Sequence, residues 1–345
     1  MDMIVIQKLT KKLLVFGTAA ILTGCSSIQG GITNFAIGIV EDRIVPPILE
    51  LNDVDMGCQF ATSGFPLISG ATRAFYGDPA LLESLLYTTS AVCSEKRSVD
   101  EELRYLRATR ANQISDAQDA RIAQKRLLEI TARRQFSAFK VMRSHLEEKY
   151  DFEYGKTCPN FERDYDELTF ILGTVAGLQA VINDIASQQM VGVPTDIAPL
   201  SERALKCVSN TKWWGVPLAA RSVVWNILPG GAEGKDVWGS FNRSMLIGER
   251  SGVRLAHVMY AISAQAAGDE KRFRDATKRW AAAQNFKPSK QYRLVEDIST
   301  LTMINLSDRY WSANIGTRTP IASIGTYWDE SNSAAQDIDL GDLLE

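Results

Sequence analysis

The sequence predicts an all-α protein made of stacked antiparallel helical hairpins. Two observations carry this prediction. Residues 98–150 contain no proline or glycine, and apolar side chains recur along them at roughly helical spacing. Turn signals also separate consecutive helical stretches, at Gly77-Asp78-Pro79, at Pro229-Gly230-Gly231 and at Gly268-Asp269. Turns of this kind are typical of two helices that pack side by side in opposite directions.

The N-terminus has the layout of a secretory signal peptide. Three lysines precede an apolar run, residues 13–22, that is too short to span a bilayer as a mature helix. The run ends at Leu22-Thr23-Gly24-Cys25, which resembles the bacterial lipoprotein signal. We therefore expect removal of residues 1–24 and acylation of Cys25. Ser26, where an aspartate would favour the inner membrane, favours a periplasm-facing lipoprotein at the outer membrane of a Gram-negative bacterium. The alternative is an ordinary secreted protein in which Cys25 is incidental.

The remaining chain divides into three parts. Residues 25–47 begin with a short Ser- and Gly-containing spacer, end at Pro46-Pro47, and are expected to form a lipidated tether. Residues 48–328 are expected to form a single α-helical hairpin-repeat domain. Residues 329–345 carry acidic but no basic side chains, so we expect a disordered tail.

The cysteines support export to an oxidising compartment. Setting Cys25 aside leaves four, Cys58, Cys93, Cys158 and Cys207. Cys58 and Cys93 lie on either side of the first turn signal, which would place them opposite each other in a hairpin, and Cys158 with Cys207 follows by elimination. The alternative is four buried free thiols. A zinc site is less favoured, because no two of these cysteines have ligand spacing.

Helices can be assigned in order along the first half of the chain. Residues 54–76 form a helix interrupted by Gly64 and Pro66, and a second helix follows over 80–93 with Asp78 as its N-cap. Ser98 and Glu101 form a capping-box pattern. The stretch from there to Tyr150 is either one long helix or two that join near residues 112–115. Residues 163–189 form an apolar helix in which Gly173 and Gly177 would let a neighbour approach closely.

The second half of the chain is expected to form shorter helices. They cover residues 200–208, 216–228, 235–248 and 292–310, with one more hairpin over 254–287. That hairpin has the length of a tetratricopeptide repeat and a similar placement of small and aromatic residues. The sequence therefore predicts a degenerate tetratricopeptide-like array.

Composition argues against nucleic-acid binding. The chain has 38 Lys and Arg against 41 Asp and Glu, a net charge of −3. A nucleic-acid-binding domain would carry an excess of positive charge.

Several motifs resemble the TatT-type lipoproteins, the T components associated with TRAP transporters. The most specific is the Pro229-Gly230-Gly231 hairpin. The other motifs are the helix with Phe241 and Arg243, Gly252, Val258-Met259-Tyr260-Ala261, Phe273, the Gly77–Leu82 turn, the basic helix Arg121–Phe136 and the terminal helix Leu294–Tyr310. The resemblance covers about residues 50–311. The chain departs from the family at Thr169-Phe170, where members usually have a Tyr-Trp pair.

The resemblance implies a helical body that forms a ring-like homo-oligomer. Such a body would dock the periplasmic solute-binding protein of a TRAP transporter and offer a channel or cleft to a small organic or hydrophobic ligand. Independently, stacked helical hairpins form concave surfaces that suit binding. Aromatic side chains with a few cations suit an apolar ligand that bears a carboxylate. The candidate lining residues of this kind are Trp213, Trp214, Arg221, Trp225, Arg243 and Tyr260. The alternative for each is a place in the core of a hairpin.

The sequence gives no support to an enzymatic function. No phosphate-binding loop, dinucleotide fingerprint, zinc-protease or serine-hydrolase motif occurs, and the only histidines are His145 and His257. We expect no cofactor, no metal and no catalysis. The alternative function is a structural, pilotin-like lipoprotein that assists outer-membrane assembly without a small-molecule ligand.

Overall fold

The computed structural model describes residues 31, 33–75, 77–283 and 286–330, and these residues form helices and loops without any strand. The predicted all-α class is confirmed. The elements are η1 (Val40–Ile44), α2 (Val45–Leu49), α3 (Val54–Ala74), α4 (Ala80–Arg110), α5 (Ile114–Tyr150), α6 (Asp164–Ala186), α7 (Ile197–Ala204), η2 (Leu205–Cys207), α8 (Val216–Ile227), α9 (Val237–Ser251), α10 (Leu255–Ala266), α11 (Glu270–Ala282) and α12 (Arg293–Ile315).

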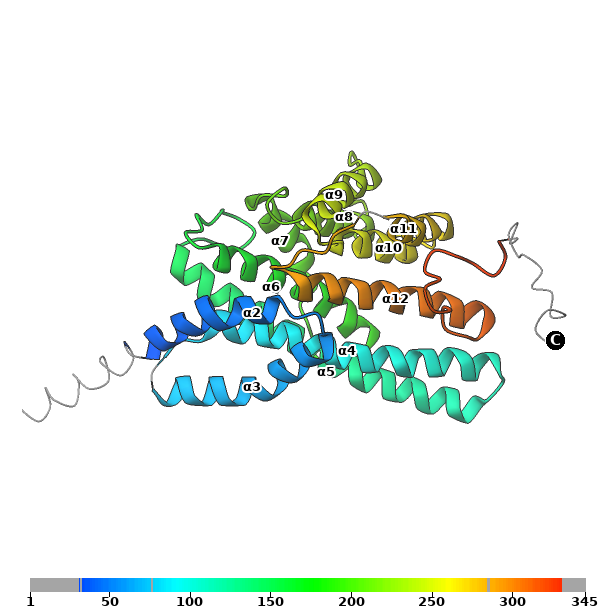
Figure 1. The fold of residues 1–345 in the computed structure, drawn as a ribbon, viewed down its shortest axis with the longest axis horizontal. Coiled ribbons are helices and arrows are strands. Elements are labelled where there is room, and N and C mark those ends of the chain that lie inside the picture. The colour runs from blue at the N-terminus through cyan, green and yellow to red at the C-terminus, as the bar shows by residue number, and fades with distance from the viewer. Residues whose placement is uncertain (1–30, 32, 76, 284–285, 331–345) are drawn as a thin grey trace, which may run out of the picture.

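The helices stack in three tiers (Figure 1). Helices α3, α4 and α5 form one outer tier, α7 to α11 form the opposite one, and α6 and α12 lie between them. The main apolar core joins α5 and α6 to the helices after them. A second, small core joins α2, α3 and α4 through Val45, Ala61, Leu82 and Leu86. The space between these two cores contains the candidate site.

The helical body begins earlier than residue 48. Residues 33–39 are already helical and continue through η1 and α2. Ile37 and Val45 are buried, and the buried Glu41 carboxylate accepts a hydrogen bond from Arg163, 2.8 Å away. The expected tether is thus part of the packed body from residue 33 onward, because its apolar side chains find partners there. The predicted signal peptide, residues 1–24, and Cys25 lie outside the described residues.

Both expected disulfides are present. Cys58 on α3 pairs with Cys93 on α4, with 5.6 Å between their Cα atoms, and Cys158 pairs with Cys207, with 5.3 Å between theirs. The first bond crosses the α3–α4 hairpin as the turn at Gly77-Asp78-Pro79 predicts. On the chain-entropy model, closing either loop stabilises the fold by about 4 kcal/mol.

The long helices of the first half differ from the prediction in one respect. Helix α4 runs without a break from Ala80 to Arg110, so the helix start expected at Ser98 is wrong. The Ser98 hydroxyl donates to the Glu95 carbonyl within the helix instead of capping a new one. Of the two predictions for residues 98–150, the break near 112–115 is confirmed: α4 ends at Arg110, and Asn112 adopts a left-handed conformation in the turn before α5.

Helix α6 packs closely on α5 through its two glycines. A Cβ atom at Gly177 would lie 2.6 Å from the Phe139 ring, and one at Gly173 would lie 3.0 Å from Met142. The predicted close approach of a neighbouring helix is therefore confirmed. Among the described residues, α6 alone is long and apolar enough to cross a membrane, but most of it is buried inside the helix stack, as expected for a core helix.

The second half follows the predicted hairpins. Helices α8 and α9 flank Pro229-Gly230-Gly231, and α10 and α11 flank Gly268-Asp269, where the Asp269 side chain caps α11 by accepting from the Arg272 amide. The tetratricopeptide arrangement itself stays a prediction. Helix α4 alone has 31 residues, whereas a complete two-helix repeat of that class has about 34.

The first residues of the expected acidic tail belong to the body. Asp329 accepts hydrogen bonds from Arg274 on α11 at 2.8 Å, and Glu330 pairs with Lys278. The expected tail begins at residue 329, but these two residues are held by cations on α11. Residues 331–345 lie outside the described residues.

The α5–α6 contact can be tested by a matched pair of substitutions. Gly177→Ala should destabilise the protein by about 1–3 kcal/mol, because the added methyl group overlaps the buried Phe139 ring. Gly70→Ala on α3 meets no atom within 4 Å and should be neutral or stabilising by up to about 1 kcal/mol. Urea unfolding with the disulfides intact measures both. Equal stability of the two variants would contradict the contact.

Candidate functional site

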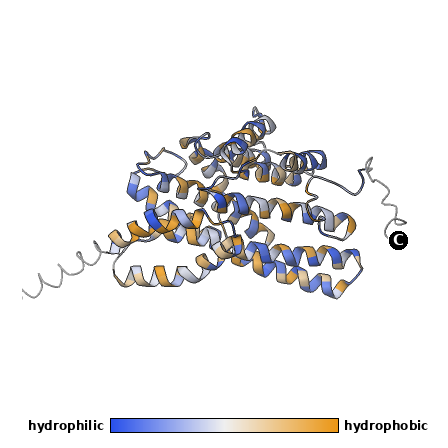
Figure 2. Cartoon of the chain, in the orientation of Figure 1, coloured by the Kyte–Doolittle hydropathy of each residue, from blue (hydrophilic) through white to orange (hydrophobic). Residues whose placement is uncertain are grey.

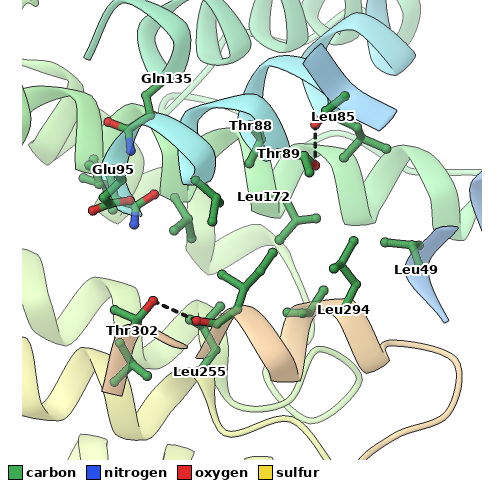
Figure 3. A pocket seen from close by; sticks show the side chains of 18 of the residues that line it. Leu49, Leu85, Thr88, Thr89, Glu95, Gln135, Leu172, Leu255, Leu294 and Thr302 are labelled. Atoms are coloured by element: carbon green, nitrogen blue, oxygen red, sulfur yellow. Dashed lines mark hydrogen bonds between the residues drawn. The ribbon is translucent and has the colours of Figure 1, made fainter. Parts of the chain in front are cut away.

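An elongated apolar cavity separates the two cores. Helices α4 and α6 line one side, α10 and α12 line the other, and α2 and α3 cover one end (Figure 3). Its volume is about 180 Å³. For comparison, an engineered apolar cavity of about 150 Å³ stays dry and binds benzene. We call this space the central cavity.

The cavity exists because two apolar surfaces face each other without meeting. Leu172, Val175 and Ile182 follow one stripe of α6 at helical spacing and keep some exposed surface although α6 is a core helix. Across the space lie Leu255 on α10 and Leu294 on α12. Such a wall offers dispersion contacts to an apolar guest and few hydrogen bonds to water.

The two ends of the central cavity differ in polarity. Figure 3 shows Leu49, Leu85 and Leu294 toward one end, and Glu95 and Gln135 toward the other. Gln135 is buried and accepts a hydrogen bond from Asn183 at 2.8 Å. An occupant would therefore meet mainly apolar side chains, together with the hydroxyls of Thr88 and Thr89, at one end, and the Glu95 carboxyl and the Gln135 amide at the other.

A second hollow continues from the polar end. It has a volume of about 310 Å³ and shares part of its lining, including Glu95, Gln179 and Thr302, with the central cavity. Polar side chains such as Asn305 and Arg309 complete it. We call it the polar vestibule. Together, the two spaces would suit a molecule with an apolar body and a polar head.

Glu95 stands at the junction of the two spaces. Helix α4 presents it one turn after Val92, and it is the only charged residue that α4 contributes to the described lining of the central cavity. Among the described residues, none donates a hydrogen bond to its carboxylate. Burial raises the pKa of Glu95, and the positive charge of Arg309 opposes that shift.

Two cations line the polar vestibule, Lys96, which pairs with Asp55 at 2.8 Å, and Arg309. The Nη2 of Arg309 donates to Glu102 at 2.7 Å, which fixes one side of the guanidinium. Its Nε is buried and has no hydrogen-bond partner among the described residues. A buried donor without an acceptor is costly, so a rotation of the guanidinium that presents Nε to an oxygen acceptor of a bound molecule would be stabilising.

The six predicted lining residues lie outside this site. Trp213 and Trp214 are almost fully buried in the loop before α8, where their rings are 5.6 Å apart and Trp214 packs on Tyr292. Tyr260 is buried between Trp238 and Phe241 and donates to Asp275 at 3.0 Å. These three aromatic residues occupy core positions.

Of the other three residues, two are hydrogen-bonded to a neighbouring carboxylate and one is exposed at the surface. Arg221 and the Trp225 indole both donate to one oxygen of Glu202, at 3.2 and 3.0 Å. Burial raises the pKa of Glu202, but the hydrogen bonds from Lys206, Trp225 and Arg221 outweigh it, so the net shift is downward. Arg243 is exposed on α9 beside Asp236. The structure thus brings Arg221 close to Trp225, and Trp213 close to Trp214. It places none of the six residues on the wall of the central cavity.

Sequence reasoning missed Glu95 and Arg309. The sequence does contain one signal for Glu95. It is an acidic residue between Val92 and Val99, at a position where the helical periodicity of α4 predicts an apolar side chain. A carboxylate there is either paired or beside a polar space. No sequence pattern predicts the central cavity, because the residues that line it are of the same types as the residues of the core.

The histidines do not suggest a catalytic site. His257 is fully buried, and its Nε2 lies 2.9 Å from Glu249, with burial lowering the pKa of the imidazole. His145 pairs with Asp78 at the surface. Within the described ranges, no group of three His, Cys, Asp or Glu side chains is arranged to hold a metal ion.

The shifted pKa of Glu95 predicts how stability depends on pH. The native state holds the Glu95 proton above pH 4.5, where the unfolded state releases it, so this group makes stability fall as pH rises through that window. Glu95→Gln should therefore be more stable than the wild type at neutral pH, and the difference should shrink as the pH approaches 4.5. Urea unfolding across this range measures it. Glu148→Gln, an exposed position on α5, is the control. A pH-independent difference for Glu95→Gln would contradict the assignment.

Comparisons with known proteins add no information on the site. No family model, no curated protein and no solved structure matches the chain.

Proposed function

We propose that this protein is a lipid-anchored periplasmic binding protein that holds an apolar ligand with an oxygen-bearing head group. The observation that carries the proposal is the central cavity with its polar vestibule. The body of the ligand would lie between α6 and α12. Its head would lie near Glu95, where the Nε of Arg309 needs an acceptor.

The charges at the polar end favour a carboxylate or a hydroxyl head over an amine. A carboxylate would accept from Arg309, and it would further favour the protonated form of Glu95, whose pKa is already raised by burial. A cationic head would lie close to the Arg309 guanidinium. An acyl chain of medium length is therefore the ligand class that these residues suit best.

The partner of such a protein follows from the sequence resemblance. As a T component of a TRAP transporter, it would dock the periplasmic solute-binding protein, pass a ligand to or from it, and form a homo-oligomer. The support is the set of motifs around the Pro229-Gly230-Gly231 hairpin. We also propose that the protein has no catalytic activity.

The alternative, a pilotin-like assembly lipoprotein without a small-molecule ligand, is less favoured. A solid body with one exposed apolar groove would suit that role. The internal space between the two cores instead suits a ligand that is enclosed.

Ligand binding can be tested with three molecules that share one tail. Decanoate and 1-decanol should raise the Tm of the wild type more than decylamine does, because the polar end offers an unpaired donor. At a ligand concentration of 100 Kd the stabilisation should be about 2.7 kcal/mol. Val175→Phe, which places a ring in the central cavity, should abolish most of this effect. Ile114→Phe at the exposed start of α5 is the matched control. If decanoate stabilised the Val175→Phe and Ile114→Phe variants equally, the central cavity would not be the binding site.

Lipid attachment can be tested by mass spectrometry of the N-terminal peptide. We expect the mature protein to begin at Cys25 and to carry acyl chains on it. Cys25→Ala should lose both the lipid mass and the cleavage before residue 25. A mature N-terminus at another residue would contradict the lipoprotein prediction.

A further inference from the structure

The outer face of α3 carries no charge. No Asp, Glu, Lys or Arg occurs between Asp55 and Arg73, although α3 lies at the edge of the helix stack. Leu67 is 74% exposed and Phe75 is 55% exposed. A surface helix in water normally carries charged or polar side chains on its outer face. Helix α11 does so, with Lys271 and Lys278 among its exposed residues.

The helical segment that precedes η1 adds exposed apolar side chains beside this uncharged surface. Phe35 is 72% exposed and Ile39 is 46% exposed. The Thr33 hydroxyl donates to the Phe75 carbonyl at 2.8 Å, so the start of this segment lies against the end of α3. Figure 2 shows hydrophobic residues along both elements. We call Phe35, Ile39, Leu67 and Phe75 the anchor-side face.

The length of chain before the described residues places this face close to the lipid anchor. Gly31 is the sixth residue after Cys25, and six extended residues span about 20 Å at most. The sequence carries no charged residue between Lys12 and Glu41. If Cys25 is acylated, Phe35 and Phe75 are held within a short distance of the bilayer surface.

We propose that the anchor-side face rests on the lipid bilayer, with Phe35 and Phe75 inserted at the boundary between head groups and acyl chains. This inference rests on the lipid attachment in the proposed function and is independent of ligand binding. An uncharged face with Phe and Leu side chains is typical of helices that lie in this boundary. The anchor and the face then act together, because the anchor raises the local concentration of the face at the membrane.

Helix α3 contributes to the central cavity as well as to the anchor-side face. Helix α3 presents Phe60 and Ala61 to the cavity, and α2 presents Ile48 and Leu49. Phe60 and Leu67 are seven residues apart, so they lie on the same side of α3, two turns from each other. The polar vestibule is lined by α4, α6, α10 and α12, and no residue of α2 or α3 is among its described lining.

The test uses the acylated full-length protein in vesicles of phosphatidylethanolamine and phosphatidylglycerol. Leu67→Cys and, as the matched control, Leu246→Cys on α9 are labelled with bimane; both positions are apolar and more than half exposed. Brominated lipids should quench the label at residue 67 several-fold more than the label at residue 246. Phe75→Glu in the Leu67→Cys background should reduce that quenching.

Two outcomes would overturn the proposal. Equal quenching at the two positions, in a sample whose N-terminal peptide carries the acyl chains, would show that the face does not contact lipid even though the anchor is present. Shielding of the residue 67 label from iodide in detergent, together with the mass of a dimer, would show that a second copy of the chain covers the face. Loss of the acyl mass would instead refute the lipid attachment, and ligand binding is measured separately.

Discussion

The close contact between α5 and α6 decides where the cavity lies. Gly173 and Gly177 allow Phe139 and Met142 to reach the α6 backbone, which fixes that face of α6 against α5. The opposite face, with Leu172, Val175 and Gln179, must then point at α10 and α12. Because α12 is held by its own contacts with α4 and α10, it cannot move in to close the gap. A tight contact on one side of a helix thus leaves an open space on the other.

Much of the fold could be predicted from local signals. Turn residues such as Gly77-Asp78-Pro79 mark hairpins, and the hairpin in turn places Cys58 opposite Cys93. The prediction that a helix starts at Ser98 is wrong, because the capping pattern involves only two residues and lies inside a continuous helix of 31 residues. The sequence predicts a tether over residues 25–47, because nothing local reveals that Ile37 and Glu41 find partners in the body.

The candidate site could be predicted much less well. Aromatic residues and arginines were the natural choice for a ligand pocket, yet Trp213 and Tyr260 fill the core and Arg221 is bonded to Glu202. An aliphatic cavity is made by a small displacement between surfaces that would otherwise form ordinary core. Only long-range packing determines whether a leucine touches its neighbour or an open space, and the residue type does not record it. Glu95 is the exception, because a carboxylate on an apolar face requires either a partner or a polar opening.

The two disulfides join consecutive cysteines along the chain, Cys58 with Cys93 and then Cys158 with Cys207. The four cysteines other than Cys25 can pair in three ways, and this is the only pairing in which the two loops neither cross nor enclose each other. If the chain is exported and Cys25 is acylated, as proposed, an oxidase that joins the remaining thiols in the order in which they emerge would form both native bonds directly. The chain would then mature without an isomerase to reshuffle mispaired cysteines, and each half could be covalently closed as soon as its own helices had folded.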